Sequence, residues 1–139
     1  MSIRIFYDGT SFRYKSWKKT QKLLGEVITK ERKISGDVNI IITKDEKVRE
    51  INIEFLEHDY NTDVITFDYN AGNVVKGEVY ISLDTVRINS LNYNVSLRNE
   101  LTRTMIHGIL HLTGYEDTTD DEKAIMRGLE DHWLQIAGE

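Results

Sequence analysis

The stretch MIHGILHLTGYED, residues 105–117, combines a pair of histidines with a glycine and a following acid. His107 and His111 are four residues apart, and four residues of an α-helix turn about 400°, so the two imidazoles point to the same side. Gly114 offers a left-handed C-cap that ends the helix and turns the chain back over that side. Glu116 or Asp117 then has a route to the histidines, and we take Asp117 as the third ligand with Glu116 as the next candidate. The stretch therefore predicts a helix end that brings three metal-binding side chains together.

Zinc suits these side chains because it takes histidine nitrogens and aspartate oxygens at about 2.0–2.2 Å and keeps a fourth position for water in catalytic sites. A zinc-bound water has a pKa of about 7 and can supply hydroxide. Zinc proteases with this histidine spacing carry a glutamate directly after the first histidine as general base. Gly108 occupies that position, which argues against a peptidase of that mechanism.

The same residues also have an alternative interpretation, in which they are structural and bind no metal. Two histidines at helical spacing also arise by chance, and Asp117 alone is typical of a surface acid near the start of the next helix. We place two further histidines outside the site, because His58 falls in a predicted loop and His132 falls on an acidic amphipathic helix.

Composition indicates an ordinary globular protein. The chain has 139 residues, of which 40% are hydrophobic and 29% charged. It has no cysteine, so any metal must be held by His, Asp or Glu. The N-terminus lacks a basic segment followed by an apolar run, and no stretch approaches the roughly 18 apolar residues that span a bilayer. We expect a cytoplasmic protein without a membrane partner.

Charge is distributed unevenly along the chain. The net charge is −5, yet residues 13–33 hold eight basic and two acidic residues, and residues 116–139 hold eight acidic and two basic ones. Two solvated helix faces explain these clusters, and a basic helix that meets phosphates is the alternative. The lysines of that alternative are Lys15, Lys18, Lys19 and Lys22.

The hydrophobic patterns predict a single domain over residues 1–139, of the α+β class, with a roughly four-stranded mixed sheet packed against helices. We expect strands at residues 3–8, 37–43, 64–69 and 77–83. We expect helices over 16–28, after residue 43, over 85–91, over 96–112 and after residue 119. Two capping boxes support the second and last helices, Thr43 with Glu46 and Thr119 with Glu122. The apolar faces of these helices are predicted to hold Val48, Ile51, Phe55 and Leu56, and Ile125, Met126, Leu129, Trp133 and Ile136.

The motif HGILHLTGYED resembles the signature of the YbeY family of bacterial endoribonucleases, HGxLHLxGYDH, in which three histidines bind zinc. Three further segments are similar to that family. INIEFLEHDYNTDVITFDY (51–69) resembles its LNxxyRxxDxpTDVLSFp segment, KGEVYIS (76–82) resembles its GDIxIS strand, and Glu100 stands seven residues before His107, as in its ELxxLxxHG. The resemblance runs from about Val48 to Tyr115.

The chain departs from the family pattern at two positions. Asp117 stands where the family has its third histidine, so the resemblance implies one zinc ion on His107, His111 and Asp117, with one ligand changed in kind. The additional negative charge makes the bound water less acidic and admits other divalent metals. Leu56 stands where the family has an arginine that is thought to act on RNA.

The resemblance implies a zinc-dependent, single-strand-specific endoribonuclease that acts in 3′-end maturation of small-subunit ribosomal RNA and in ribosome quality control. Its implied partners are ribosomal RNA and the small ribosomal subunit. A ribosome assembly factor with a structural metal is the second hypothesis, which the loss of arginine at Leu56 and the net charge of −5 favour. A third, a hydrolase of a non-nucleic substrate, fits the zinc ligands but not the basic helix.

No residue of the motif is a clear general acid or base. Glu78 and Glu100 are candidates for hydrogen bonding to an imidazole N–H, or else are a structural cap or an exposed acid. The cations that could replace the missing arginine are Arg87, Arg98 and Arg103, and Arg103 lies closest to His107 on a helical wheel.

Overall fold

The computed structural model describes residues 2–56 and 62–139. Its described strands are β1 (Ile3–Tyr7), β2 (Ile34–Thr43), β3 (Val64–Asp68) and β4 (Val74–Ser82), which form one sheet in the order β1-β2-β4-β3. β1, β2 and β4 are parallel, and β3 is antiparallel to β4. The predicted four-stranded mixed sheet and the α+β class are confirmed.

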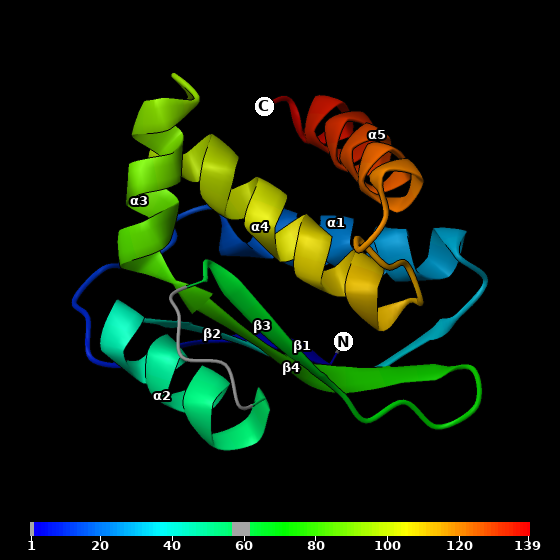
Figure 1. Cartoon of the computed structure of the whole chain (residues 1–139). Helices are drawn as coiled ribbons and strands as arrows, with labels where there is room; N and C mark the ends of the chain where they lie inside the picture. The colour runs from blue at the N-terminus through cyan, green and yellow to red at the C-terminus, as the bar shows by residue number, and fades with distance from the viewer. Residues whose placement is uncertain (1, 57–61) are drawn as a thin grey trace.

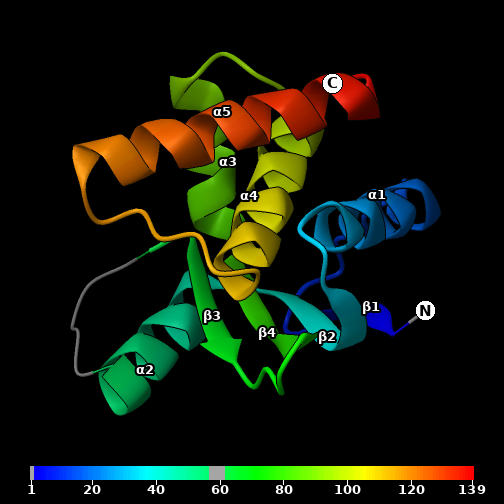
Figure 2. The same cartoon turned by 90° about the vertical axis from the view of Figure 1, so that its right-hand side faces the viewer.

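Helices cover both faces of the sheet (Figures 1 and 2). The helices are α1 (Trp17–Lys30), α2 (Asp45–Leu56), α3 (Leu83–Asn92), α4 (Leu97–Leu112) and α5 (Asp120–Ala137). α1 and α4 lie on one face, α2 lies on the other, and α5 packs across α4 as an outer layer. α4 is therefore enclosed between the sheet and α5, which holds its histidine face in a fixed position.

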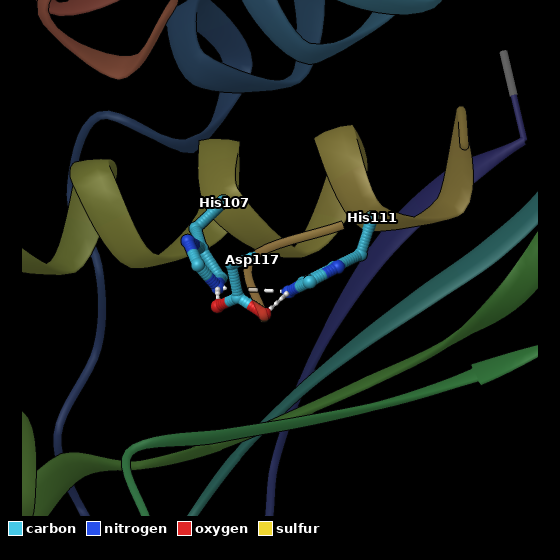
Figure 3. Close-up of side chains that lie close together, drawn as sticks. All are labelled: His107, His111 and Asp117. Atoms are coloured by element: carbon cyan, nitrogen blue, oxygen red, sulfur yellow. Dashed lines mark hydrogen bonds and ion pairs between the residues drawn. The ribbon is translucent and has the colours of Figure 1, made fainter. Parts of the chain in front are cut away.

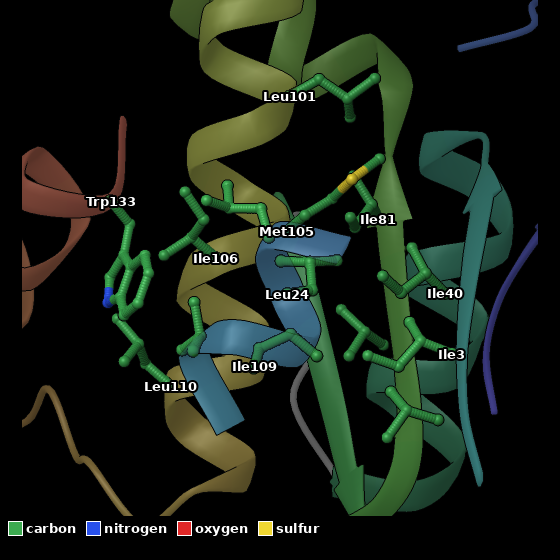
Figure 4. Packing of buried hydrophobic residues seen from close by; sticks show 14 of the residues in the cluster. Ile3, Leu24, Ile40, Ile81, Leu101, Met105, Ile106, Ile109, Leu110 and Trp133 are labelled. Atoms are coloured by element: carbon green, nitrogen blue, oxygen red, sulfur yellow. The ribbon is translucent and has the colours of Figure 1, made fainter. Parts of the chain in front are cut away.

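The main core lies between the sheet and the pair α1 and α4 (Figure 4). Ile40 and Ile81 project from the strands to meet Leu24 of α1 and Met105 and Ile109 of α4, and all five are fully buried. Each such side chain contributes roughly 1.5–3 kcal/mol through removal of apolar surface from water. Alternate residues of a strand face opposite sides, so the predicted strand pattern accounts for this layer.

Gly108 explains how closely α4 approaches the sheet. A Cβ atom at this position would lie 2.6 Å from Cγ1 of Val79 on β4, which is shorter than a van der Waals contact. Only glycine permits this approach of the helix. Gly108 therefore has two consequences: the histidine motif lacks the glutamate base of the zinc proteases, and α4 packs closely against β4.

Helix α2 begins differently from the prediction. Thr43 is the last residue of β2, and α2 begins at Asp45, whose N–H donates to the Asp84 carboxylate at 3.1 Å. The predicted Thr43 cap is thus wrong, because an acid of α3 caps the helix instead. The Thr119 and Glu122 capping box is confirmed.

Four residues of the predicted apolar faces are exposed. Val48 and Ile51 on α2 and Met126 and Trp133 on α5 are buried as expected. The exposed residues are Phe55, Leu56, Ile125 and Ile136. One stripe of each helix meets the core, and these side chains lie beside that stripe.

Candidate metal centre

Helix α4 places the two histidines on the face that looks toward the start of β3. The side chain of Ser96 accepts a hydrogen bond from the N–H of Asn99 and fixes where α4 begins. One helical turn separates His107 from His111, and their Nε2 atoms lie 3.0 Å apart. Both rings are partly buried, with 21% and 19% of the side-chain surface exposed.

The turn after α4 brings the acid back to the histidines. Gly114 has a φ of 115°, which is left-handed and favours glycine. Its N–H donates to the carbonyl of His111 at 3.0 Å, and the N–H of Tyr115 donates to the carbonyl of Leu110 at 3.1 Å. These two bonds form a Schellman motif. The predicted return of the chain at Gly114 is thus confirmed.

Asp117 completes a group of three donors (Figure 3). Its carboxylate oxygens lie 3.3 Å from Nε2 of His107 and 3.5 Å from Nε2 of His111. Glu116, the adjacent acid, is exposed and does not belong to the group. The structure therefore brings together the three residues that the sequence singled out.

The spacing of these donors fits a tetrahedral metal. Ligands at about 2.0–2.1 Å from a zinc ion lie about 3.3 Å from one another in a tetrahedral site. The three contacts, at 3.0, 3.3 and 3.5 Å, bracket that value. Two imidazoles and one carboxylate also leave a fourth position for water, as in catalytic zinc sites. The group could hold a metal ion.

The second ring nitrogen of each histidine is already engaged. Nδ1 of His111 lies 2.9 Å from the carbonyl oxygen of Tyr115. Nδ1 of His107 lies 2.7 Å from Oε2 of Glu130. Both acceptors require a proton on Nδ1, which leaves the lone pair of Nε2 free to bind a metal at the centre. The rings are therefore held in the tautomer that binds a metal through Nε2.

Glu130 was not singled out from the sequence. It projects from the buried face of α5, between Met126 and Trp133, and is itself buried. Arg103 donates to its other oxygen at 2.9 Å and to Asp131 at 2.6 Å. A buried carboxylate needs such partners. A charged residue on the apolar stripe of the last helix was the available signal.

The surroundings of His107 are strongly acidic. Burial acts to lower the pKa of His107, but the hydrogen bond and charge of Glu130, together with Asp117 and Asp63, raise it above the ordinary value. Burial also raises the pKa of Asp63, which His107 partly offsets. Asp63 belongs to the TDV segment of the resemblance, which was its signal in the sequence. A centre with this charge attracts cations.

The two glutamates expected beside the imidazoles do not bond to them. Glu78 accepts hydrogen bonds from the hydroxyls of Tyr69 at 2.9 Å and Tyr80 at 3.3 Å, outside the metal centre. Glu100 lines the same cavity as His107, but the Nδ1–H of that ring donates to Glu130 instead. The expected role therefore belongs to a residue of α5.

The three candidate arginines are committed to other contacts. Arg103 is paired with Glu130 and Asp131, as described above. Arg98 pairs with Glu139 at 2.6 Å, and the guanidinium of Arg87 lies 6.0 Å from the ring centre of Phe12. Of the three, Arg103 alone lines the cavity beside the centre.

The basic helix lies away from the metal centre. Nζ of Lys19 donates to the carbonyl oxygen of Ala137, and Lys19 and Lys22 line a cavity with Arg98 near the start of α4. Among the described residues, that cavity and those at the metal centre share no lining residue. His132 packs its ring against Trp133, outside the centre as expected, and His58 lies outside the described residues.

Among the described residues, no helix is long and apolar enough to cross a membrane.

Comparison with known proteins gives a consistent result. The family model described as Endoribonuclease YbeY matches residues 8–138. A protein named Endoribonuclease YbeY from Parabacteroides distasonis is 48% identical over 77% of this chain and 75% of its own length. One of the same name from Chlorobaculum tepidum is 45% identical over 82% of this chain and 86% of its own length.

A solved structure supports the fold. The solution structure of a protein from Thermotoga maritima is 31% identical in sequence, with a TM-score of 0.70. The match covers 97% of this chain and 88% of that one.

Proposed function

The chain belongs to the YbeY family of endoribonucleases, and from this premise we propose that it is a zinc-dependent, single-strand-specific endoribonuclease. We place its action in 3′-end maturation of small-subunit ribosomal RNA and in ribosome quality control, with ribosomal RNA and the small subunit as partners. Residues 1–139 act as one metal-dependent hydrolase domain in the cytoplasm. The convergence of His107, His111 and Asp117 is the observation that carries this proposal.

In this proposal one zinc ion binds His107 and His111 through Nε2 and Asp117 through its carboxylate. When bound, zinc supplies a Lewis acid for a phosphate oxygen and makes a water acidic enough to give hydroxide near neutral pH. The remaining roles belong to the chain. Glu130 and the Tyr115 carbonyl orient the two rings, and Arg103 balances the charge of Glu130.

Asp63 is placed to handle a proton. It lines a cavity of about 330 Å³ together with His107, His111 and Asp117. In the metal-free centre, burial raises the pKa of Asp63 above that of an ordinary aspartate, so this side chain is suited to carry a proton as well as to release one. In this role Asp63 exchanges a proton with the attacking water or the leaving oxygen, which none of the three ligands can do.

The basic helix is proposed as a separate contact for RNA. Lys19 and Lys22 lie near the start of α4, at the opposite end from His111, and Lys15 and Lys18 lie close to them in the sequence. The four lysines would hold a strand that extends beyond the site. Binding should weaken with salt in proportion to the phosphates that they neutralise. Reversal of two of these charges flattens the salt slope if the lysines contact RNA, and leaves it unchanged if they form a solvated face.

One observation favours the assembly-factor alternative. Leu56 replaces the family arginine and is exposed at the end of α2, and Arg103 is held by two acids. A phosphate in the centre therefore meets fewer free arginines than the family pattern provides. In that alternative the chain binds the small ribosomal subunit and its metal serves stability.

Two assays on one preparation separate the candidates. Cleavage of single-stranded and duplex RNA and binding to small ribosomal subunits are measured with zinc, after chelation and after zinc is restored. The proposed enzyme cleaves only single-stranded RNA and loses this activity reversibly on chelation. A protein that binds subunits but cleaves neither RNA with zinc present is the assembly factor instead.

A further inference from the structure

A second cavity adjoins the metal centre, and several of the residues that line it have no role in the proposed chemistry. It has a volume of about 230 Å³, lies between α3, α4 and α5, and shares His107 and Asp117 with the centre. Pockets for drug-sized ligands are roughly 300–1,000 Å³. This cavity therefore suits a single flat group that is attached to a chain bound at the metal.

Glu100 on the wall of this cavity lacks a partner. Its surface is only 4% exposed, yet its carboxylate has no hydrogen bond with any residue in the described ranges 2–56 and 62–139. Its carboxylate oxygens reach the cavity rather than being sealed inside the protein, so a ligand can contact them. Burial raises the pKa of Glu100, and the positive charges of Arg103 and Arg127 favour its ionised form and act against that rise. The group is suited to accept N–H donors from a ligand.

Two exposed cations and an exposed tyrosine also line this cavity. Lys123 and Arg127 lie one turn apart on α5, are exposed, and have no ion pair with the described part of the chain. This distinguishes them from Arg98 and Arg103, which are both paired. Tyr93, just after α3, is a residue that is 56% exposed and lines the same cavity. A flat ring, an unmet acceptor and two free cations are thus gathered in one cavity.

From these groups, and resting on the proposed ribonuclease function, we propose that the cavity is a subsite for one unpaired guanine nucleotide of the RNA substrate. The base stacks on Tyr93, its adjacent N1–H and N2–H groups donate to the two oxygens of Glu100, and its phosphate lies between Lys123 and Arg127. Single-stranded RNA is commonly read by stacking on aromatic rings and by bonds to the base edge.

The acceptor selects guanine among the four bases. A carboxylate accepts two parallel donors, one on each oxygen. Guanine presents two adjacent N–H donors on its Watson–Crick edge. On the same edge of adenine and of cytosine, the amino group lies next to an unprotonated ring nitrogen, whose lone pair repels the second carboxylate oxygen. Uracil has a single N–H on this edge, and a carbonyl oxygen lies on each side of it. The subsite therefore sets a sequence preference next to the scissile bond.

The probes are guanosine, inosine and uridine 5′-monophosphates, with binding to the zinc-loaded protein measured by calorimetry. Inosine lacks only the N2 amino group. The guanosine nucleotide should bind roughly tenfold more tightly than the inosine one, the scale of a hydrogen bond to a charged group. Glu100→Gln should abolish this difference. Equal binding of the three nucleotides, or a preference that survives Glu100→Gln, overturns the proposal.

Matched variants test the other two contacts. Tyr93→Leu should weaken the guanosine nucleotide roughly tenfold, whereas Tyr69→Leu, at an equally exposed tyrosine outside the cavity, should not. Lys123→Gln with Arg127→Gln should weaken guanosine monophosphate but not guanosine. Lys44→Gln, just before α2, with Lys47→Gln, in its first turn, makes the same charge change at two exposed lysines as a control. Equal effects of each pair overturn the assigned contacts.

Failure of the subsite is distinguishable from failure of the proposed function. Zinc content and RNA cleavage are measured on the same samples. Zinc-dependent cleavage without any guanine preference rejects the subsite and keeps the ribonuclease. A guanine preference that depends on Glu100, in a protein that cleaves no RNA, supports the subsite and rejects the ribonuclease.

Discussion

Oε2 of Glu130 lies 2.7 Å from Nδ1 of His107, and this contact joins two helices that are separated in the sequence. Helix α5 supplies the carboxylate and α4 supplies the ring. The same glutamate is held from its other side by Arg103. Orientation of the metal-binding ring therefore depends on how α5 packs against α4.

Glu130→Gln should lower zinc affinity about 10- to 100-fold, the usual effect of losing a carboxylate that orients a metal-binding histidine. Glutamine keeps the volume, so the packing of α5 should survive. Competition with a coloured chelator measures the affinity. Asp131→Asn serves as control, because Asp131 bonds the same arginine but does not contact His107. Equal zinc affinity in the wild type and Glu130→Gln contradicts the orienting role.

Zinc binding should survive replacement of Asp117 by another metal ligand but not by a residue that cannot bind metal. Asp117→Ala should lower bound zinc sharply, and Asp117→His should keep it, because histidine is the family's own residue at this offset. Metal analysis of purified protein gives the result, with Glu116→Ala as the neighbouring control. Full zinc in Asp117→Ala, together with loss in Glu116→Ala, shows that the third ligand has been misassigned.

Gly108→Ala should destabilise the fold by about 1–3 kcal/mol through overpacking against Val79. The free energy of unfolding in urea measures this cost. Gly128→Ala on α5 is a matched control with open space around its Cβ, and it should stabilise by roughly 0.5–1 kcal/mol. Val79→Ala should relieve the clash, so the double variant should lose less than the two single variants combined. Simple additivity contradicts the contact.

Leu56→Arg should increase the rate of RNA cleavage without changing zinc content. Leu56 is 41% exposed, so the substitution costs little stability, and arginine restores a planar cation that pairs with phosphate. Ile53→Arg on the same helix is 46% exposed in the wild type and controls for added charge. If both variants raise the rate equally, general electrostatics explains the gain and the specific role of position 56 is wrong.

The local part of the metal centre was predictable because short-range geometry determines it. The pairing of His107 with His111 follows from the helix period, and the approach of Asp117 follows from the left-handed turn at Gly114. The Thr119 and Glu122 box was likewise predictable, since both partners lie within one turn. Patterns over a few residues contain this information.

Contacts between distant elements were not predictable from those patterns. Glu130 reaches His107 only because α5 crosses α4, and no local spacing records that crossing. In the same way, Asp84 caps α2 in place of Thr43 because the start of α3 lies near the start of α2. In both cases the hydrogen-bond partner predicted from the sequence is replaced by an acidic residue from another helix. The partners of a buried polar group thus depend on tertiary packing.

Zinc titration into metal-free protein, with the single-turnover rate of single-stranded RNA cleavage followed at each addition, tests the central claim most directly. We expect the rate to rise from zero and to level off at one zinc per chain, with His107→Ala and His111→Ala inactive at the same zinc concentration. Full cleavage before zinc is added, or an unchanged titration in both histidine variants, contradicts the assignment of a zinc-dependent ribonuclease to this centre.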